Sequence, residues 1–206
     1  MDEPVAFFTG GGPASGKDSF VEGLQARWGN VLAYIDPDKF KFKMPEYSQM
    51  MSTDDEEKAA GHVHEESSYL AKEALRRAIA SGRPFLFDSV LKNVPYLTET
   101  MGTLKAKGYF IEIRFMDCPP EETARRAKKR GKETGRHVND DEVRESNTKA
   151  VRGLHALKHL ADTVRVYSSY KTPDNKPLLV YEIIDGQVKI HQPDRVDELR
   201  ARGHQM

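Results

Sequence analysis

Residues 5–19 read VAFFTGGGPASGKDS, and this stretch decides the fold. Its first five residues, Val5 to Thr9, are apolar or β-favouring, so we expect a buried strand. Three glycines follow at once, and after the loop comes an amphipathic segment, FVEGLQARW, that is typical of a helix. The spacing from Gly11 through Gly16 to Lys17 matches GxxxxGK. This order of strand, glycine-rich loop and helix predicts a P-loop, the phosphate-binding turn of an α/β nucleotide-binding fold.

The chemistry of the loop explains its spacing. Glycines let the backbone turn so that successive amide N–H groups face a bound phosphate. The start of the helix adds partial positive charge, and Lys17 supplies an ammonium group for the β- and γ-phosphates. A nucleoside triphosphate is therefore the expected ligand. The residues expected to bind ATP here are Gly11, Gly12, Pro13, Ala14, Ser15, Gly16, Lys17, Asp18 and Ser19.

One position departs from the usual P-loop pattern. Ser or Thr normally follows the lysine and holds Mg²⁺, whereas this chain has Asp18 there and Ser19 one place later. A carboxylate can ligate Mg²⁺, but without the metal its negative charge repels the phosphates. Either Asp18 is a metal ligand, or it caps the helix and Ser19 or water serves the metal. A glycine-rich turn that binds nothing is the other interpretation of this loop.

Composition restricts the class of protein. At 206 residues the chain is long enough for one well-buried α/β domain, which we expect to span residues 1–206. The 32 basic and 32 acidic residues balance, which gives no support to nucleic-acid or anionic-membrane binding. A single cysteine, Cys118, excludes an internal disulfide, and no apolar run approaches the length of a membrane span. The N-terminal segment lacks the basic start of a signal peptide, so we expect a cytoplasmic protein.

Two further predicted strands end in carboxylates. Val31–Ile35 is followed by Asp36 and Asp38, and the apolar strand Pro84–Ser89, expected to be central, carries Asp88 near its end. Carboxyl ends of parallel strands lie at the ligand-binding edge of the sheet, beside the P-loop. Asp38 or Asp36 can accept a hydroxyl proton there, and Asp88 can hold Mg²⁺ as a Walker B acid. The alternatives are an ordinary turn for the first pair and a helix cap for Asp88.

The segment between these strands offers a candidate pocket for an acceptor. Lysines alternate with phenylalanines in KFKFK, residues 39–43, which is typical of a solvated edge; the alternative is that one lysine, such as Lys41, contacts a phosphorylated acceptor. A helix is expected over residues 54–80, with a break near Gly61 and an apolar stripe of Val63, Leu70, Ala74, Leu75 and Ile79. Another face of this helix either lines a polar acceptor pocket or forms a charged outer face; it carries His62, Glu66, Tyr69 and Glu73.

A cationic segment follows the fourth predicted strand, Tyr109–Met116. The helix EETARRAKKRGKETGR carries Arg126 and Arg130 on one face, and the glycine-broken loop after it carries Arg136. Glutamates four residues before two of the arginines explain part of the charge as ion pairs within the helix. They cannot occupy every cation, so we interpret residues 119–140 as a lid whose arginines stabilise a transferring phosphoryl group. A plain solvated helix is the alternative.

The rest of the chain supplies further elements of the same fold. Helices are expected over Val94–Lys107 and from Asn139, where a capping box begins, to about His159. A strand is expected in ADTVRVYSS, and two more are expected across the turn at residues 185–186. A short surface helix is expected over Arg195–Met206. Together these elements predict an α/β three-layer sandwich with a mostly parallel central sheet, a helical lid, and C-terminal strands and a short helix in residues 161–206.

In this order, the motifs resemble those of the zeta toxin family of P-loop kinases. The resemblance covers about Val5–Ser168 and rests on YIDPDKFK, on GHVHEESSYLAKEAL before GRPFLFDSVLKN, and on RAKKRGKETGRHV. It implies ATP and Mg²⁺ as cofactors and phosphorylation of the 3′-hydroxyl of the sugar in UDP-N-acetylglucosamine. It also implies a small antitoxin protein as a candidate partner.

The resemblance further implies roles for individual residues. Lys17 would bind the β- and γ-phosphates, Asp38 would be the base at the acceptor hydroxyl, and Asp88 would be the acid after the third strand. The lid residues implied to bind phosphate are Arg136 with Arg126 or Arg130. The residues that we place near the acceptor with Asp38 and Asp88 are Lys41, Glu66, Glu73 and Lys92.

Two features depart from the family's pattern: the residue after Lys17 and the pair after Asp88. Asp18 replaces Ser or Thr, so we count Asp18, Ser19 and Asp88 as the candidate metal ligands. Ser89 and Val90 replace the small and hydroxylated pair that usually follows the acid, and Val90 removes a hydroxyl that could contact the substrate.

From the motifs and the resemblance together, we expect an ATP-dependent kinase of a nucleotide sugar. The alternatives are a kinase of another hydroxyl, as in a nucleoside, nicotinamide nucleotide or antibiotic, or a nucleotide-binding module that does not catalyse.

Overall fold

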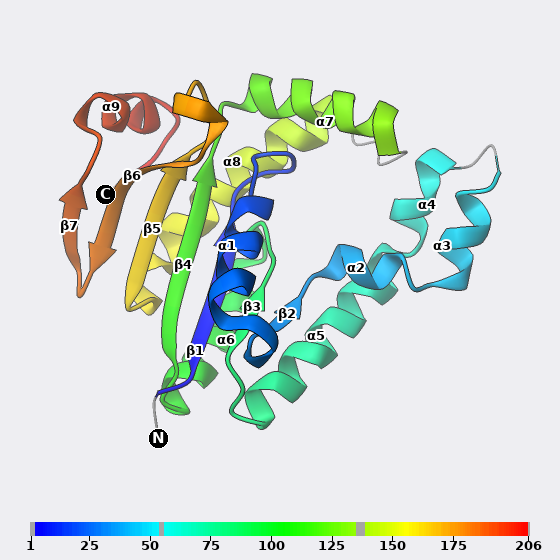
Figure 1. Ribbon diagram of the computed structural model, residues 1–206, viewed down its shortest axis with the longest axis horizontal. Helices are drawn as coiled ribbons and strands as arrows, with labels where there is room; N and C mark the ends of the chain where they lie inside the picture. Colours follow the sequence, from blue (N-terminus) through cyan, green and yellow to red (C-terminus); the bar gives the residue numbers. More distant parts are fainter. Residues whose placement is uncertain (1–2, 54–55, 135–138, 206) are drawn as a thin grey trace.

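A seven-stranded sheet forms the centre of the protein in the computed structural model, which describes residues 3–53, 56–134 and 139–205 (Figure 1). The strands lie in the order β2-β3-β1-β4-β5-β6-β7; the first five are parallel, and β6 and β7 are antiparallel to their neighbours. Their bounds are β1 (Val5–Gly10), β2 (Ala33–Ile35), β3 (Phe85–Phe87), β4 (Phe110–Asp117), β5 (Thr163–Ser168), β6 (Leu178–Ile184) and β7 (Gln187–Ile190).

Helices cover both faces of the sheet. In Figure 1, α1 lies in front of the sheet, α6 and α8 lie behind it, and α7 runs along the edge where the parallel strands end. The bounds are α1 (Asp18–Trp28), α2 (Pro37–Lys41), α3 (Pro45–Met50), α4 (Glu56–His62), α5 (His64–Ala80), α6 (Val94–Ala106), α7 (Pro120–Thr134), α8 (Asp140–Leu157) and α9 (Pro193–Ala201). The fold is thus the expected α/β three-layer sandwich. Among the described residues, no helix is both long and apolar enough to cross a bilayer.

Two apolar clusters fix the sheet between these layers. The larger one joins the sheet to the helices behind it, and Phe8, Phe85 and Phe115 in it are at most 1% exposed. The smaller one lies under α1 and contains Phe7 and Leu24. Alternation along β1 sends neighbouring side chains to opposite faces, so this one strand supplies both clusters. The carboxyl ends of β1, β3 and β4, where the site lies, are thereby held by packing on both sides.

Most expected strands and helices are confirmed within one to three residues. β3 lies inside the sheet, between β1 and the edge strand β2, and is buried along its length. The hairpin of β6 and β7 turns at Asp185 and Gly186, which have φ values of 50° and 76°. Both residues therefore adopt the left-handed conformation that such two-residue turns require. The C-terminal surface helix is α9, which begins at Pro193 and ends at Ala201.

The segment between β2 and β3 differs from the expectation. KFKFK, residues 39–43, is solvated in part as expected, since Lys39, Phe42 and Lys43 are exposed. Its first three residues nevertheless belong to a helix: residues 37–41 form α2, because Asp36 caps the helix and Pro37 occupies its first position. The expected helix over 54–80 is two helices, α4 and α5, and the break falls at Val63 rather than at Gly61. An additional helix, α3, precedes them. Figure 1 shows α3 and α4 extending away from the sheet, opposite the end of α7.

Candidate functional site

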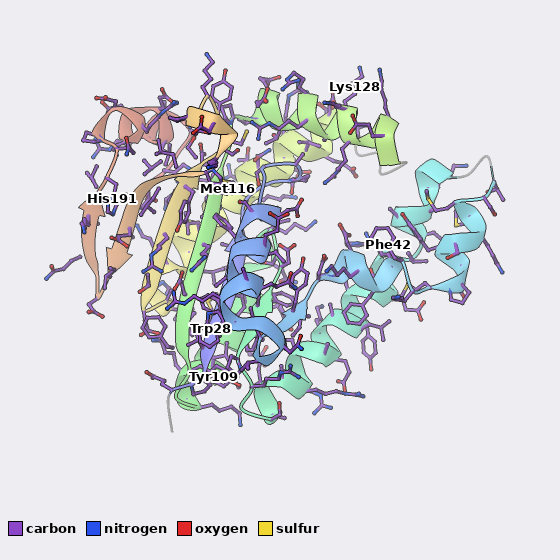
Figure 2. All side chains as sticks on the ribbon, in the orientation of Figure 1. Trp28, Phe42, Tyr109, Met116, Lys128 and His191 are labelled. Atoms are coloured by element: carbon purple, nitrogen blue, oxygen red, sulfur yellow. The ribbon has the colours of Figure 1, made fainter. Side chains whose placement is uncertain are left out.

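The loop between β1 and α1 has the backbone of a phosphate-binding turn. Gly11, Ala14 and Gly16 have φ values of 122°, 56° and 96°, so three of the six residues 11–16 have a positive φ. A side chain has no room at the start of this loop. A Cβ on Gly11 would lie 2.4 Å from the carbonyl oxygen of Met116, and one on Gly12 would lie 2.2 Å from Asn147 Oδ1. The loop is therefore packed tightly between the end of β4, where Figure 2 labels Met116, and α8.

Lys17 closes the loop with its own side chain. Its Nζ donates to the carbonyl oxygens of Gly11 at 2.8 Å and Gly12 at 2.9 Å. Burial lowers the pKa of Lys17, and nearby carboxylates, Asp88 foremost, oppose that shift. An ammonium group held by two neutral carbonyls in a buried position has lost much of its hydration. Phosphate oxygens would compensate this charge better than the carbonyls do.

The loop opens onto a cavity of about 600 Å³. Residues from the P-loop, the end of β2, the end of β3, α5, α6 and α7 line it together. The predicted site residues that line it are Pro13, Ala14, Ser15, Gly16, Lys17, Asp18, Asp38, Asp88, Lys92 and Arg130. Segments far apart in sequence thus contribute to one cavity, as the positions of the strand ends predicted.

Asp88 is a half-buried carboxylate in the lining of this cavity. One of its oxygens accepts a hydrogen bond from Thr9 Oγ1, and the other lies 3.4 Å from the hydroxyl of Tyr34. Burial raises the pKa of Asp88, the ammonium of Lys17 and the bond from Thr9 lower it, and the neighbouring carboxylates of Asp36 and Asp18 raise it again; the net shift is upward. Asp88 is therefore a carboxylate whose charge lacks compensation from the protein, as expected of a group that faces a cation.

Asp36 and Asp38 have different positions although both line the cavity. Asp36 caps α2: its Oδ1 accepts the N–H of Asp38 at 2.8 Å. The carboxylate of Asp38 is 40% exposed and forms an ion pair of 3.1 Å with Lys41 one helical turn later. Lys41 therefore lies beside the cavity rather than in its lining, and it can hold the carboxylate of Asp38 in place. Of the two acids, Asp38 has the carboxylate that a ligand can reach.

The acceptor side of the cavity is formed by a different face of α5 from the expected one. The helix turns His64, Glu65, Ser68 and Lys72 toward the cavity. Glu66 and Glu73 are not in the lining, which corrects the expectation for these two residues. Glu73 binds Arg76 and Arg77 at 2.8 and 2.9 Å on the outer surface, and these hydrogen bonds lower its pKa to about 2.

Several cations surround the acceptor side. Lys72 lies 5.0 Å from the centre of the Tyr96 ring, and both residues line the cavity. Burial lowers the pKa of His64, and the positive charges of Lys41 and Lys92 lower it further. Burial and the neighbouring cations thus both disfavour the protonated form of His64. This end of the cavity suits an anionic or strongly polar ligand.

The loop after β3 is held in a strained conformation. Leu91 has φ of 64°, which is rare for a branched residue, and its side chain is fully buried. The hydroxyl of Ser89 donates to the carbonyl oxygen of Thr9 and accepts the N–H of Leu91. That hydroxyl is therefore already used within the loop and does not replace the one that Val90 lacks. Val90 and Lys92, on either side of the buried Leu91, both line the cavity.

The three arginines predicted in the lid differ in where they lie. Arg130 lines the cavity from α7, and its charge lowers the pKa of Lys17. Arg126 is not in the lining: it binds Glu122 at 2.7 Å and Ser169 through two further hydrogen bonds, so we correct its expected contact with phosphate. Ser169 in turn donates to the carbonyl oxygen of Ser15 at 2.7 Å, so Arg126 ties α7 to the P-loop. Arg136 lies outside the described residues.

The residues present fit a metal that arrives with a nucleotide. In residues 3–53, 56–134 and 139–205, no group of three or more His, Cys, Asp or Glu side chains forms a preassembled metal site. Mg²⁺ bound with nucleotide phosphates takes only one or two protein carboxylates, so such a group is not required. Asp88 and Asp18, which both line the cavity, are carboxylates that could hold such an ion. Ser19 is not in the lining and donates its hydroxyl to the carbonyl oxygen of Gly16, so its expected role as a ligand has no support in this arrangement.

The similarities of this chain to known proteins agree with the geometry of the site. A family model described as Zeta toxin matches residues 1–183. Curated relatives called Toxin zeta, from Enterococcus hirae and Streptococcus pyogenes, are each 30% identical to this chain over 122 residues. That alignment covers 58% of this chain and 41% of each relative, so it spans less than half the length of those proteins.

Solved structures share the fold at low identity. A structure of the PezAT chromosomal toxin–antitoxin system of Streptococcus pneumoniae has a TM-score of 0.67 at 16% identity, covering 98% of this chain and 86% of that one. A complex of AvrRxo1-ORF1 and ORF2 with ATP has a TM-score of 0.71 at 17% identity, covering 99% and 65%. At these identities the likeness concerns the arrangement of the backbone.

Proposed function

Because the chain belongs to the zeta toxin family, we propose that it is an ATP-dependent kinase that phosphorylates a sugar hydroxyl of UDP-N-acetylglucosamine. One observation carries the proposal: Lys17, Asp88 and Asp38 line the same cavity. The first binds donor phosphates, the second faces the cation that accompanies them, and the third reaches a hydroxyl. Phosphoryl transfer needs donor and acceptor in line and the charge on the γ-phosphoryl group neutralised, and little else from the protein.

The residues divide the reaction as follows. The hydroxyl proton of the acceptor passes to a carboxylate oxygen of Asp38, the hydroxyl oxygen bonds to the γ-phosphorus, and the bond from that phosphorus to the β–γ bridging oxygen breaks to release ADP. Lys17 leaves the carbonyls of Gly11 and Gly12 to bind β- and γ-phosphate oxygens. Arg130 binds the transferring group from α7. Mg²⁺, when bound, neutralises phosphate charge, and Asp88 and Asp18 would hold it.

The acceptor side supports a polar, anionic acceptor. Lys72 and Lys92 can pair with a diphosphate, and His64 and Ser68 can donate to sugar or base oxygens. Val90 presents a methyl surface where the family's hydroxyl would stand. For this reason a kinase of another hydroxylated metabolite is the second candidate, and the experiment below separates the two.

We also propose an antitoxin protein as a partner. One neighbour in fold belongs to a toxin–antitoxin system, PezAT, and another was solved as AvrRxo1-ORF1 with ORF2. Co-expression of this chain with the product of an adjacent reading frame, followed by co-purification, tests the proposal. Purification of the chain alone under these conditions would count against it.

The activity is tested by incubating the protein with ATP, Mg²⁺ and UDP-N-acetylglucosamine and detecting a phosphorylated product by mass spectrometry. We expect one added phosphoryl group on the sugar, and no product with Lys17→Ala. The matched control is Lys43→Ala, since Lys43 is exposed and outside the cavity lining. A metabolite extract is tested in parallel: a product from another hydroxyl compound alone would replace the proposed acceptor, and no product from either would contradict kinase activity.

A further inference from the structure

Tyr34 joins the ends of two neighbouring strands through its hydroxyl group. It lies in the middle of β2, and its hydroxyl donates to Asp36 Oδ2 at 3.0 Å. The same hydroxyl lies 3.4 Å from Asp88 Oδ2, at the end of β3. A phenol has one proton, so the shorter contact, to Asp36, takes most of the hydrogen bond. The hydroxyl thus lies between two carboxylates and donates mainly to Asp36.

The bond to Asp36 reaches the candidate base through one carboxylate. Asp36 Oδ1 accepts the backbone N–H of Asp38 at 2.8 Å, while Oδ2 accepts the hydroxyl of Tyr34. The last torsion of an aspartate side chain is broad when only one oxygen is engaged. With both oxygens engaged the carboxylate plane is fixed, and the peptide that carries Asp38 is fixed with it. The orientation of Asp38 therefore depends on a hydroxyl four residues earlier.

One further contact makes Tyr34 suited to this role. The ammonium group of Lys39 lies 4.2 Å from the centre of its ring, so α2 also packs on the ring. The ring is therefore held in place from the helix that carries Asp38.

The pairing of the two strands does not depend on this hydroxyl. The N–H of Asp88 donates to the carbonyl oxygen of Ile35 at 2.8 Å, and β2 and β3 pair in register from Ala33–Phe85 to Ile35–Phe87. The backbone alone thus holds the strands together. What the hydroxyl adds is the orientation of the side chains at their ends.

We propose that Tyr34 is a positioning residue for phosphoryl transfer: its hydroxyl orients Asp36 and, through Asp36, holds the peptide that presents Asp38 to the cavity. This inference rests on the function proposed above, in which Asp38 accepts the hydroxyl proton. It assigns Tyr34 no contact with substrate, because Tyr34 is not in the lining of the cavity.

The test compares Tyr34→Phe with Tyr109→Phe in the full-length protein. Both changes remove one hydroxyl and keep the ring. The hydroxyl of Tyr109 binds the carbonyl oxygens of Ala78 and Arg83, and Figure 2 shows Tyr109 at the opposite end of β4 from the P-loop. Three quantities are measured: hydrogen–deuterium exchange of the amides of residues 36–41 without ligand, ADP affinity by calorimetry, and kcat and KM for transfer to UDP-N-acetylglucosamine.

We expect Tyr34→Phe to speed exchange of the Asp38 amide about ten-fold, the size of one lost hydrogen bond. We expect kcat to fall about ten-fold with ADP affinity and the KM for ATP unchanged, since the P-loop is untouched. Tyr109→Phe should change neither exchange in residues 36–41 nor kcat.

Either of two results would overturn the inference. The first is wild-type exchange and wild-type kcat in Tyr34→Phe; the second is an equal loss in both variants, which would indicate general destabilisation. If the wild-type protein transfers nothing to UDP-N-acetylglucosamine, the proposed function fails on its own. The exchange measurement then still decides whether the hydroxyl of Tyr34 holds the peptide of Asp38.

Discussion

A methyl group added at Gly153 tests how closely α8 supports the site. A Cβ there would lie 1.9 Å from the carbonyl oxygen of Leu91 and 2.8 Å from its carbonyl carbon. Both are backbone atoms of the strained loop after β3, so no side-chain rotation relieves the overlap. Either α8 moves outward or the loop that carries Val90 and Lys92 moves into the cavity.

Two effects of Gly153→Ala oppose each other. Alanine in place of glycine inside a helix stabilises by about 1 kcal/mol. Overpacking of a buried contact costs about 1–3 kcal/mol, and a backbone overlap of this size belongs at the upper end. We therefore expect a net loss of about 2 kcal/mol in the free energy of unfolding, or about 4–8 °C in Tm for a chain of this size.

The measurement is urea denaturation followed by circular dichroism, with Gly102→Ala as the control. Gly102 lies inside α6, and a Cβ there meets nothing within 4 Å, so only the helix propensity changes. We expect that control to be about 1 kcal/mol more stable than wild type. Equal stabilisation by both substitutions would refute the close approach of α8 to Leu91.

Three further variants test separate contacts. Asp117→Asn should reduce the fall in the free energy of unfolding that the wild-type protein shows below about pH 4. Burial alone would raise the pKa of Asp117, but hydrogen bonds, from His204 foremost, lower it. The carboxylate therefore stabilises the fold above its unfolded pKa, and this stabilisation is lost on acidification. Arg126→Ala should destabilise by about 1–3 kcal/mol in urea denaturation, because it breaks the tie through Ser169 to the P-loop. Lys72→Ala should raise the KM for the acceptor about ten-fold in steady-state kinetics and leave the KM for ATP unchanged.

Each of these has a matched control on the surface. Asp197→Asn removes an exposed carboxylate and should leave the pH dependence of stability unchanged. Arg125 is 67% exposed and binds the same residue as Arg126, Glu122. Arg125→Ala should therefore change the free energy of unfolding by less than about 0.5 kcal/mol. Glu73→Gln should leave the KM for the acceptor unchanged. A rise in KM equal to that of Lys72→Ala would indicate that Glu73 contacts the acceptor after all.

The sheet and the P-loop could be predicted because their signals are local. A short apolar run followed by GGGPASGK specifies a strand, a turn and a helix with no help from distant residues. The acids at the ends of β2 and β3 could be brought to the same edge because parallel strands end together. In each case the sequence pattern and the rule for the fold were sufficient.

The face of α5 could be predicted only in part because tertiary packing selects it. Leu75 is buried and Ala74 and Ile79 pack against the core, as expected. The buried stripe contains Ser67 and Ala71, whereas Leu70, expected in the core, is 36% exposed. The hydroxyl of Ser67 bonds to the carbonyl oxygen of His64 at 2.9 Å, so a polar residue is buried without cost and obscures the apolar pattern. Rotating the stripe by one position moves Glu66 outward and turns His64 toward the cavity.

Contacts between distant residues were also beyond the sequence. Tyr34 meets Asp88 across 54 positions, and Arg126 meets Ser169 across 43. Nothing in YIDPDKFK distinguishes a tyrosine that only packs from one whose hydroxyl orients a carboxylate. An arginine on a lid helix likewise has the same pattern whether it binds phosphate or ties the helix to the P-loop.

The most direct test of the account is single-turnover phosphoryl transfer by Asp38→Asn, measured together with its ATP affinity. We expect transfer to slow by roughly 10²- to 10⁴-fold, as for a lost general base, while ATP binds as in wild type because the P-loop and Lys17 are unchanged. Wild-type transfer by this variant would contradict the claim that one cavity presents both the phosphates of ATP and a hydroxyl held by Asp38.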